Sequence, residues 1–327
     1  TTSDRNVAIG YQALKDLSNT GAQKNIVIGW KAGLGGSGDM SDNVAIGDNA
    51  MDGTGTLDAL ANIFIGRDAG GGTWTTAASN YNVGIGNYAL DGALNGALYN
   101  IAMGHNSLTA LTTGDANVSI GYGAGYALTT GYSNILIGRA AGDAGTDMTD
   151  TVIIGHYAGS SINTNNSQGS VLIGSEAGTN QTGGVNTFIG YHAGRNNRTG
   201  TYITTVGYEA GMHATASANT FMGYQAGKGG TTSAPFSSGG SNTAVGYQAL
   251  TGFTTAVNNV AVGYEAGYNV TTGYQLTTIG YRAGRALTTQ TNNTFIGFDA
   301  GIGNTGSSNL AIGNQSLNAS AGGSNNI

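Results

Sequence analysis

The chain has 327 residues, with 11 Lys and Arg against 17 Asp and Glu, and a formal net charge of −6. This negative balance disfavours a nucleic-acid-binding surface, and the absence of cysteine excludes disulfides and thiolate metal sites. No apolar run approaches the roughly 18 residues of a membrane span, so we expect no membrane insertion. Charged residues make up only 9% of the chain, so its surface must consist mainly of Asn, Thr, Ser, Gly and Tyr.

One motif, Asn-(Val/Thr)-x-Ile-Gly-x-x-Ala-(Gly/Leu), recurs from end to end. Its glycine, numbered here as position 0, occurs 18 times, and 303 residues over 17 intervals give a mean period of 17.8. A fixed period of this size predicts a solenoid. The repeated glycines are Gly10, Gly29, Gly47, Gly66, Gly86, Gly104, Gly121, Gly138, Gly155, Gly174, Gly190, Gly207, Gly223, Gly246, Gly263, Gly280, Gly297 and Gly313.

We interpret residues 1–327 as a single repeat domain, in which the first copy of the motif begins at Asn6. The last residues, Asn325-Asn326-Ile327, match the opening of a nineteenth copy. Solenoids need capping units with polar outer faces, and neither end of this chain shows one. We therefore expect the chain to be a fragment of a longer fibre.

A short strand is predicted over positions −4 to −1 of each copy, first at 6–9, then at 25–28 and so on to 309–312. Position −3 is mostly Val, Ile or Thr, and position −1 is almost always Ile or Val, as in Ile9, Ile28, Ile137 and Ile296. This alternation predicts a strand whose −3 and −1 side chains fill the core. Ile137→Asn is then expected to bury an unsatisfied amide.

Three other positions have predicted structural roles. Asn at −4, including Asn6, Asn43, Asn134 and Asn242, is expected to form a side-chain ladder along the axis. The glycine at 0 is expected to adopt a positive φ after the strand. Ala at +3 leaves only a methyl group where backbones approach closely. One strand per period predicts an all-β, parallel β-solenoid of about 18 coils.

Coil lengths vary from 16 residues, between Gly174 and Gly190, to 23 residues, between Gly223 and Gly246. Insertions in a solenoid map to loops on one face. The longest coil contains the only proline, Pro235, followed by Phe236. If the chain binds a ligand, we expect it at this loop, with Phe236 as an apolar anchor; the alternative is a tolerated insertion.

Asn-Val-Ala-Ile-Gly at 6–10 and 43–47, and Asn-Thr-Ala-Val-Gly at 242–246, resemble the YadA-like head repeats of trimeric adhesins. The longer form, with Gly-Tyr-Gln-Ala and Thr-Thr-Gly, is similar to arrays in bacteriophage tail fibres. The resemblance covers essentially the whole chain. It implies a left-handed parallel β-roll with three chains side by side. Its coils are longer here than in the adhesin repeat, and no carboxy-terminal chaperone module is visible.

Residues at −2 also favour a trimer. Several are large and apolar, among them Phe64, Phe188 and Phe221. If −1 fills the coil, −2 needs a second apolar surface, which two further copies of the chain would supply at −2 or +3. The expected function is a non-enzymatic shaft or receptor-binding segment of a trimeric fibre. Its expected location is a bacteriophage tail fibre, or alternatively a bacterial surface adhesin or extracellular filament.

No residue pattern predicts a catalytic, cofactor or metal site. The four histidines lie in separate coils, and 39–42 and 147–150 lack known calcium-loop patterns. Tyr at +1 in eight copies indicates either a strip for host-surface glycans or a structural stacking ladder, and we favour the ladder. Ice binding is a further alternative because Thr recurs at −3, although we expect those threonines to face inward.

Overall fold

The computed structural model describes residues 5–16, 22–35, 38–162, 168–231, 233, 236–318 and 322–327. The chain divides into two compact units, Thr1–Gln168 and Gly169–Ile327, each considered by itself. The described residues form strands and turns without any α-helix. In this part of the chain there is accordingly no helix that could cross a membrane.

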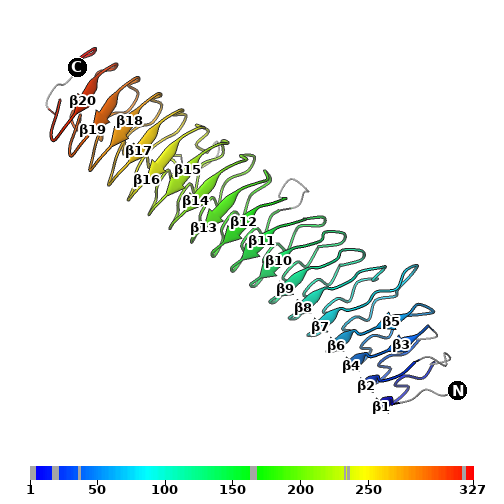
Figure 1. Ribbon diagram of the computed structural model, residues 1–327. Coiled ribbons are helices and arrows are strands. Elements are labelled where there is room, and N and C mark those ends of the chain that lie inside the picture. Colours follow the sequence, from blue (N-terminus) through cyan, green and yellow to red (C-terminus); the bar gives the residue numbers. More distant parts are fainter. Residues whose placement is uncertain are drawn as a thin grey trace. The chain divides into compact units, whose positions relative to one another are not determined.

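Short strands recur once per repeat in both units (Figure 1). Those of unit 1 are β1 (Val7–Ile9), β2 (Ile26–Ile28), β3 (Met40–Ser41), β4 (Val44–Ile46), β5 (Ala59–Leu60), β6 (Ile63–Ile65), β7 (Val83–Ile85), β8 (Ile101–Met103), β9 (Val118–Ile120), β10 (Ile135–Ile137) and β11 (Val152–Ile154). Those of unit 2 are β12 (Val171–Ile173), β13 (Thr187–Ile189), β14 (Thr204–Val206), β15 (Thr220–Met222), β16 (Thr243–Val245), β17 (Val260–Val262), β18 (Thr277–Ile279), β19 (Thr294–Ile296) and β20 (Leu310–Ile312).

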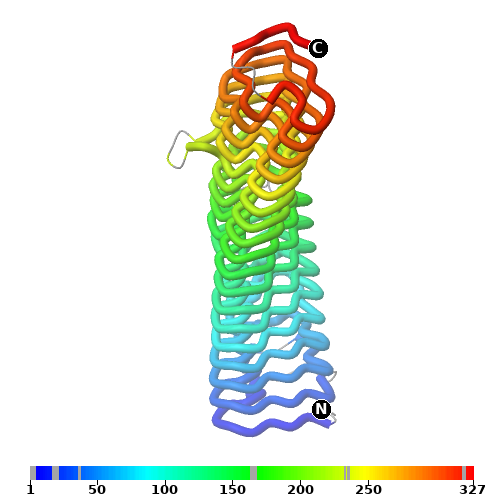
Figure 2. Tube along the Cα trace, turned by 90° about the vertical axis from the view of Figure 1, so that its left-hand side faces the viewer, coloured from blue at the N-terminus to red at the C-terminus, as the bar shows by residue number. Residues whose placement is uncertain are grey.

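Within each unit the motif strands pair in parallel with the same positions one coil on. In unit 1, for example, Ile135 pairs with Val152 and Ile137 with Ile154. Each turn of the chain therefore lies on the previous one, as the successive turns in Figure 2 show. The predicted all-β, parallel β-solenoid is confirmed, with strands that begin at −3 instead of −4. A second pairing, of β3 with β5 in unit 1, was not predicted.

The predicted assignment of strand faces is wrong. Side chains at −2, such as Phe64, Leu136 and Phe188, are completely buried inside the coils. Those at −3 and −1 point outward: Ile9 is 58% exposed, and Ile137 lies on the partly exposed side of β10. Ile28 and Ile296 are likewise only partly buried. Positions −2 and +3 consequently lie inside one chain and cannot form the contacts between chains that we expected.

The asparagines at −4 explain this orientation. Asn134 is fully buried, and its Nδ2 donates to Asn117 Oδ1 of the previous coil (2.9 Å) and to the Met148 carbonyl across its own coil (2.7 Å). Asn134 Oδ1 accepts from the backbone N–H of Thr151 in the next coil. Because side chains alternate along a strand, an inward −4 places −2 inward and turns −3 and −1 outward.

This amide ladder spans most of unit 1, where Thr151 ends it, and is interrupted in unit 2. It runs coil by coil from Asn6 to Asn134, as predicted. In unit 2, Asn242 continues it to Asn259, whereas Ile203 and Leu276 replace the amide elsewhere. At these two breaks the backbone N–H still donates to the asparagine of the preceding coil. The ladder thus satisfies polar groups that would otherwise be buried without partners.

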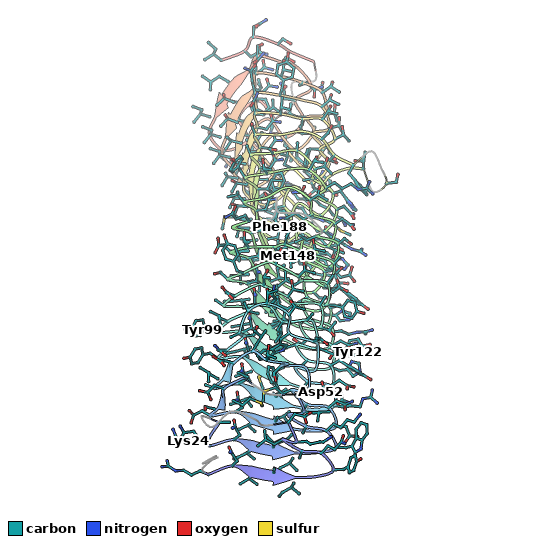
Figure 3. All side chains as sticks on the ribbon, turned by 90° about the vertical axis from the view of Figure 1, so that its right-hand side faces the viewer. Lys24, Asp52, Tyr99, Tyr122, Met148 and Phe188 are labelled. Carbon is teal, nitrogen blue, oxygen red and sulfur yellow. The ribbon has the colours of Figure 1, made fainter. Side chains whose placement is uncertain are left out.

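Residues of very different sizes at −2 fill a narrow core. A Cβ added to Gly84 would come within 2.8 Å of the Phe64 ring, so that ring occupies the space a larger neighbour would need. Alanines at +3 are buried in every coil after the first, Ala141 and Ala193 among them. Met148 also lies inside the coils, whereas Tyr99 and Tyr122 project from unit 1 (Figure 3).

The glycine at position 0 is required by both conformation and space. Gly138 has a φ of 131°, and a Cβ there would approach the carbonyl oxygen of Gly155 in the next coil to 2.5 Å. Gly190 and Gly246 have equivalent environments in unit 2. The predicted positive φ is confirmed, and close stacking of the coils adds a second reason that the sequence did not reveal.

Candidate functional surfaces

Each unit carries an uncharged surface, the outer strand face, defined as the first and third side chains of each motif strand. In unit 1 these strands are β1, β2, β4 and β6–β11; in unit 2 they are β12–β20. Every side chain on this face is Val, Ile, Leu, Met or Thr. Several are substantially exposed, including Ile26 (42%), Met103 (39%) and Met222 (43%).

The outer strand face is large for a surface exposed to water. Nine strands at about 4.8 Å spacing give a length of about 43 Å in each unit. With a width of about 10 Å, two side chains across, its area is about 400 Å² per unit. Contiguous apolar patches of several hundred Å² mark interaction sites on soluble proteins. The repeated Ile and Val residues therefore contribute a surface as well as a strand.

The face differs in chemistry between the units. Position −3 is Val or Ile throughout unit 1, whereas unit 2 carries Thr there in six strands. These threonines point outward, and the expectation that they face inward is wrong. They are Thr187, Thr204, Thr220, Thr243, Thr277 and Thr294, with Val260 replacing Thr in β17.

Beside the outer strand face of unit 2 lies the tyrosine ladder, defined as the position +1 rings from Tyr191 to Phe298. Neighbouring rings stack with centroids 4.9–5.2 Å apart and planes inclined by 5–14°. Each ring remains 40–49% exposed. The members are Tyr191, Tyr208, Tyr224, Tyr247, Tyr264, Tyr281 and Phe298.

The stacking favours the structural interpretation of these tyrosines. A sugar that binds an aromatic side chain usually lies against the ring face. Within the ladder, both faces of an internal ring such as Tyr224 are occupied by its neighbours Tyr208 and Tyr247. What remains exposed is the ring edge. The described residues of unit 1 form no comparable run of tyrosines, because position +1 there holds aromatic, charged and amide residues in turn. A shorter stack joins His105 to Tyr122.

Phe236 packs against its own chain. Its ring stacks on His213, with centroids 5.7 Å apart, and the Arg198 guanidinium lies 5.7 Å from it. His213 is almost completely buried, its Nδ1 accepts from the Asn196 amide at 2.9 Å, and burial lowers its pKa. Pro235, the other residue of the candidate binding loop, lies outside the described residues. The contacts of Phe236 favour an insertion anchored to the solenoid.

Charged residues at +2 pair with neighbouring coils. Glu209 accepts from Lys228 at 2.6 Å and from Gln225 at 2.9 Å, and these contacts lower its pKa despite the opposing effect of burial. Arg282 forms a two-pronged pair with Asp299, at 2.9 and 2.8 Å. Position +2 therefore helps to hold adjacent coils together.

Two carboxyl groups of unit 1, those of Asp52 and Asp91, have raised pKa values because their surroundings disfavour the charged form. Burial, and then the charge of Asp68, raise the pKa of Asp52 to about 6. The same two causes, with Asp52 as a third, raise the pKa of Asp91 to about 6. Burial, the larger cause, disfavours the charged carboxylate, and the negative charge of Asp68 adds to the shift, which Lys31 offsets only in part at Asp52.

The candidate calcium loops use their carboxylates locally. Asp39 accepts a hydrogen bond from the Ser41 hydroxyl at 2.8 Å, and Asp42 lies 3.5 Å from Lys24. In the second loop, Asp150 accepts from Gln168 at 3.5 Å. Across the described ranges, no three His, Asp or Glu side chains are grouped closely enough to hold a metal ion.

Comparison with known proteins identifies no relative. No protein-family model matches the chain, and neither the curated proteins nor the solved structures include a significant match.

Proposed function

We propose that this chain is a non-enzymatic structural segment of a homotrimeric fibre. The outer strand face carries the proposal. It is apolar in unit 1 and mixes apolar residues with threonines in unit 2, it lacks any charged side chain, and it extends over every motif strand of each unit. Leaving such a face exposed to water is unfavourable, because burial of apolar surface is the main driving force for protein association. We therefore expect a partner to cover it.

Other copies of the same chain are the partners that fit this face best. They present the same side chains at the same one-coil spacing, so that Ile and Val columns on facing chains can interdigitate at every step. The coil interior also favours association, since much of it is filled only by alanines such as Ala141 and Ala177. A coil with so small a core gains less from burial than an ordinary domain.

The number three and the parent particle rest on the repeat sequence. The motif resembles repeats of trimeric adhesin heads and bacteriophage tail fibres, and Gly-Tyr-Gln-Ala with Thr-Thr-Gly favours the tail fibre. A bacterial surface adhesin or extracellular filament is the alternative. In either setting the segment serves as a shaft, and a host-surface glycan or receptor would be the partner of the fibre as a whole.

Paired lysine substitutions test the buried face. Ile120→Lys with Ile137→Lys places charges on the outer strand face of β9 and β10. The matched control, Tyr126→Lys with Tyr132→Lys, changes two exposed residues of the same coils that lie off this face. We expect sedimentation velocity to show a smaller particle for the isoleucine variant only, because unpaired charges are costly in an interface. Equal assembly of both variants would contradict the proposal.

Ice binding is a second candidate, favoured by one observation. The six threonines at −3 of unit 2 face outward, beside Ile, Val and Met at −1, in a repeated array without charged side chains. The two functions exclude each other on this face, since a covered face cannot contact ice. Inhibition of ice recrystallisation by the intact protein, abolished by Thr220→Tyr with Thr243→Tyr, would favour ice binding. No inhibition by the intact protein would eliminate it.

A further inference from the structure

The tyrosine ladder leaves its phenol edges open to chemistry. Stacking covers the ring faces, yet each tyrosine remains 40–44% exposed. The exposed part therefore includes ring edges, where the hydroxyl and the two carbons ortho to it lie. Neighbouring rings are only 4.9–5.2 Å apart between centroids. Phenols this close can react with each other after small rotations of their side chains.

We propose that the tyrosine ladder is an oxidative cross-linking site at which neighbouring tyrosines of one chain are joined as dityrosine. The co-reactant is a peroxide acting through a haem peroxidase. The product links adjacent coils covalently along the outside of unit 2. This proposal is independent of the trimer, because it concerns neighbours within one chain.

The reaction balances as a two-electron oxidation. Each of two neighbouring phenols loses one electron and one proton to give a neutral tyrosyl radical. The two radicals couple through their ortho carbons, forming one C–C bond. The hydrogens on those two carbons then move to the phenolic oxygens and restore both aromatic rings. The two electrons and two protons released reduce one hydrogen peroxide to two water molecules.

Carboxylates next to two of the rings would help the proton leave. The negative charge of Glu209 raises the pKa of Tyr208, so the phenol stays protonated at neutral pH until it is oxidised. For Tyr264, burial and then the charge of Glu265 have the same effect. An oxidised phenol is a far stronger acid, and an adjacent carboxylate can accept its proton.

Such links would stabilise the solenoid much as disulfides stabilise other secreted or surface proteins. Each one closes a loop between successive coils, such as the 16 residues from Tyr208 to Tyr224 or the 23 from Tyr224 to Tyr247. Cross-linking loops of this size restricts the unfolded chain. The chain has no cysteine with which to achieve this by other means.

The test is to treat the intact protein with a haem peroxidase and limiting hydrogen peroxide, then map cross-linked peptides by mass spectrometry. We expect Tyr208–Tyr224, Tyr224–Tyr247 and Tyr247–Tyr264 links, with a dityrosine yield per chain that does not depend on protein concentration. The melting temperature of the treated protein should rise.

The matched variant is Tyr224→Phe with Tyr264→Phe. Phenylalanine preserves the stack, as Phe298 does on Tyr281 at 5.1 Å, but cannot couple. Five adjacent tyrosine pairs of the ladder then become one, Tyr191–Tyr208, and the yield of links within the ladder should fall at least threefold. The control, Tyr122→Phe with Tyr132→Phe, should retain the full yield. The proposal is wrong if no dityrosine forms, if links join different chains or scattered tyrosines, or if the ladder variant matches the control.

Discussion

Removing one amide from the asparagine ladder should destabilise the protein far more than its size suggests. Asn134→Ala deletes a fully buried side chain. The Thr151 backbone N–H and hydroxyl lose their acceptor, Asn134 Oδ1, and the Met148 carbonyl loses its donor. The Asn117 oxygen retains the backbone N–H of residue 134. Three buried groups without partners, at about 1–3 kcal/mol each, give a loss of about 3–6 kcal/mol per chain, allowing for partial relaxation.

The assay is urea unfolding followed by circular dichroism. All variants are measured at the same protein concentration, because association makes the apparent stability depend on concentration. The control is Asn269→Ala, which removes the same atoms from an exposed side chain for which the structure shows no hydrogen bond. It should change stability by less than about 0.5 kcal/mol. Similar losses for the two variants would refute the view that the ladder is a fully satisfied buried network.

Three other predictions follow from the geometry. Gly138→Ala should lower the free energy of unfolding by about 3 kcal/mol, because Gly138 has a φ of 131° and a Cβ there would clash with the Gly155 carbonyl oxygen. Gly123→Ala should lower it by only about 1 kcal/mol, because Gly123 has a φ of 62° and open space around it. Thermal melts of the two variants measure the difference. With pKa values raised to about 6, Asp52 and Asp91 favour folding below about pH 4, and this contribution is lost as the pH rises through 6. The melting temperature of Asp52→Asn with Asp91→Asn should therefore depend less on pH than that of the original protein. Phe236→Ala should lose about 1 kcal/mol from its ring contacts without unfolding the protein, and a collapse of the circular dichroism signal would contradict this.

Sequence periodicity was sufficient to predict the parallel solenoid, because each feature of the coil recurs in almost every copy. Asn at −4, Gly at 0 and the short strand between them all occupy their predicted places. The strand faces were assigned wrongly because Ile137 and its equivalents have the composition of a core. The information to correct this was present: a buried Asn134 and an inward Leu136 must share a face, since they are two residues apart. The wide range of sizes at −2, from Gly84 to Phe64, is also typical of a packed interior.

Surface features were harder to predict because they depend on neighbours in space. Tyrosine at +1 predicted a ladder, but only coordinates show that Tyr224 has both faces covered. Burial of Glu209 and its contacts with Lys228 and Gln225 come from the turn geometry, in which residues other than glycine adopt positive φ, as Glu209 does at 52°. The stacking of Phe236 on His213 arises in an insertion, where no repeat constrains the structure.

The mass of the intact protein in solution tests the central claim most directly. Light scattering over a range of protein concentrations should give 3 × 32.7 = 98.1 kDa if, as we propose, the outer strand face of each chain is buried against two others. A folded, monodisperse particle of 32.7 kDa at every concentration would contradict the account.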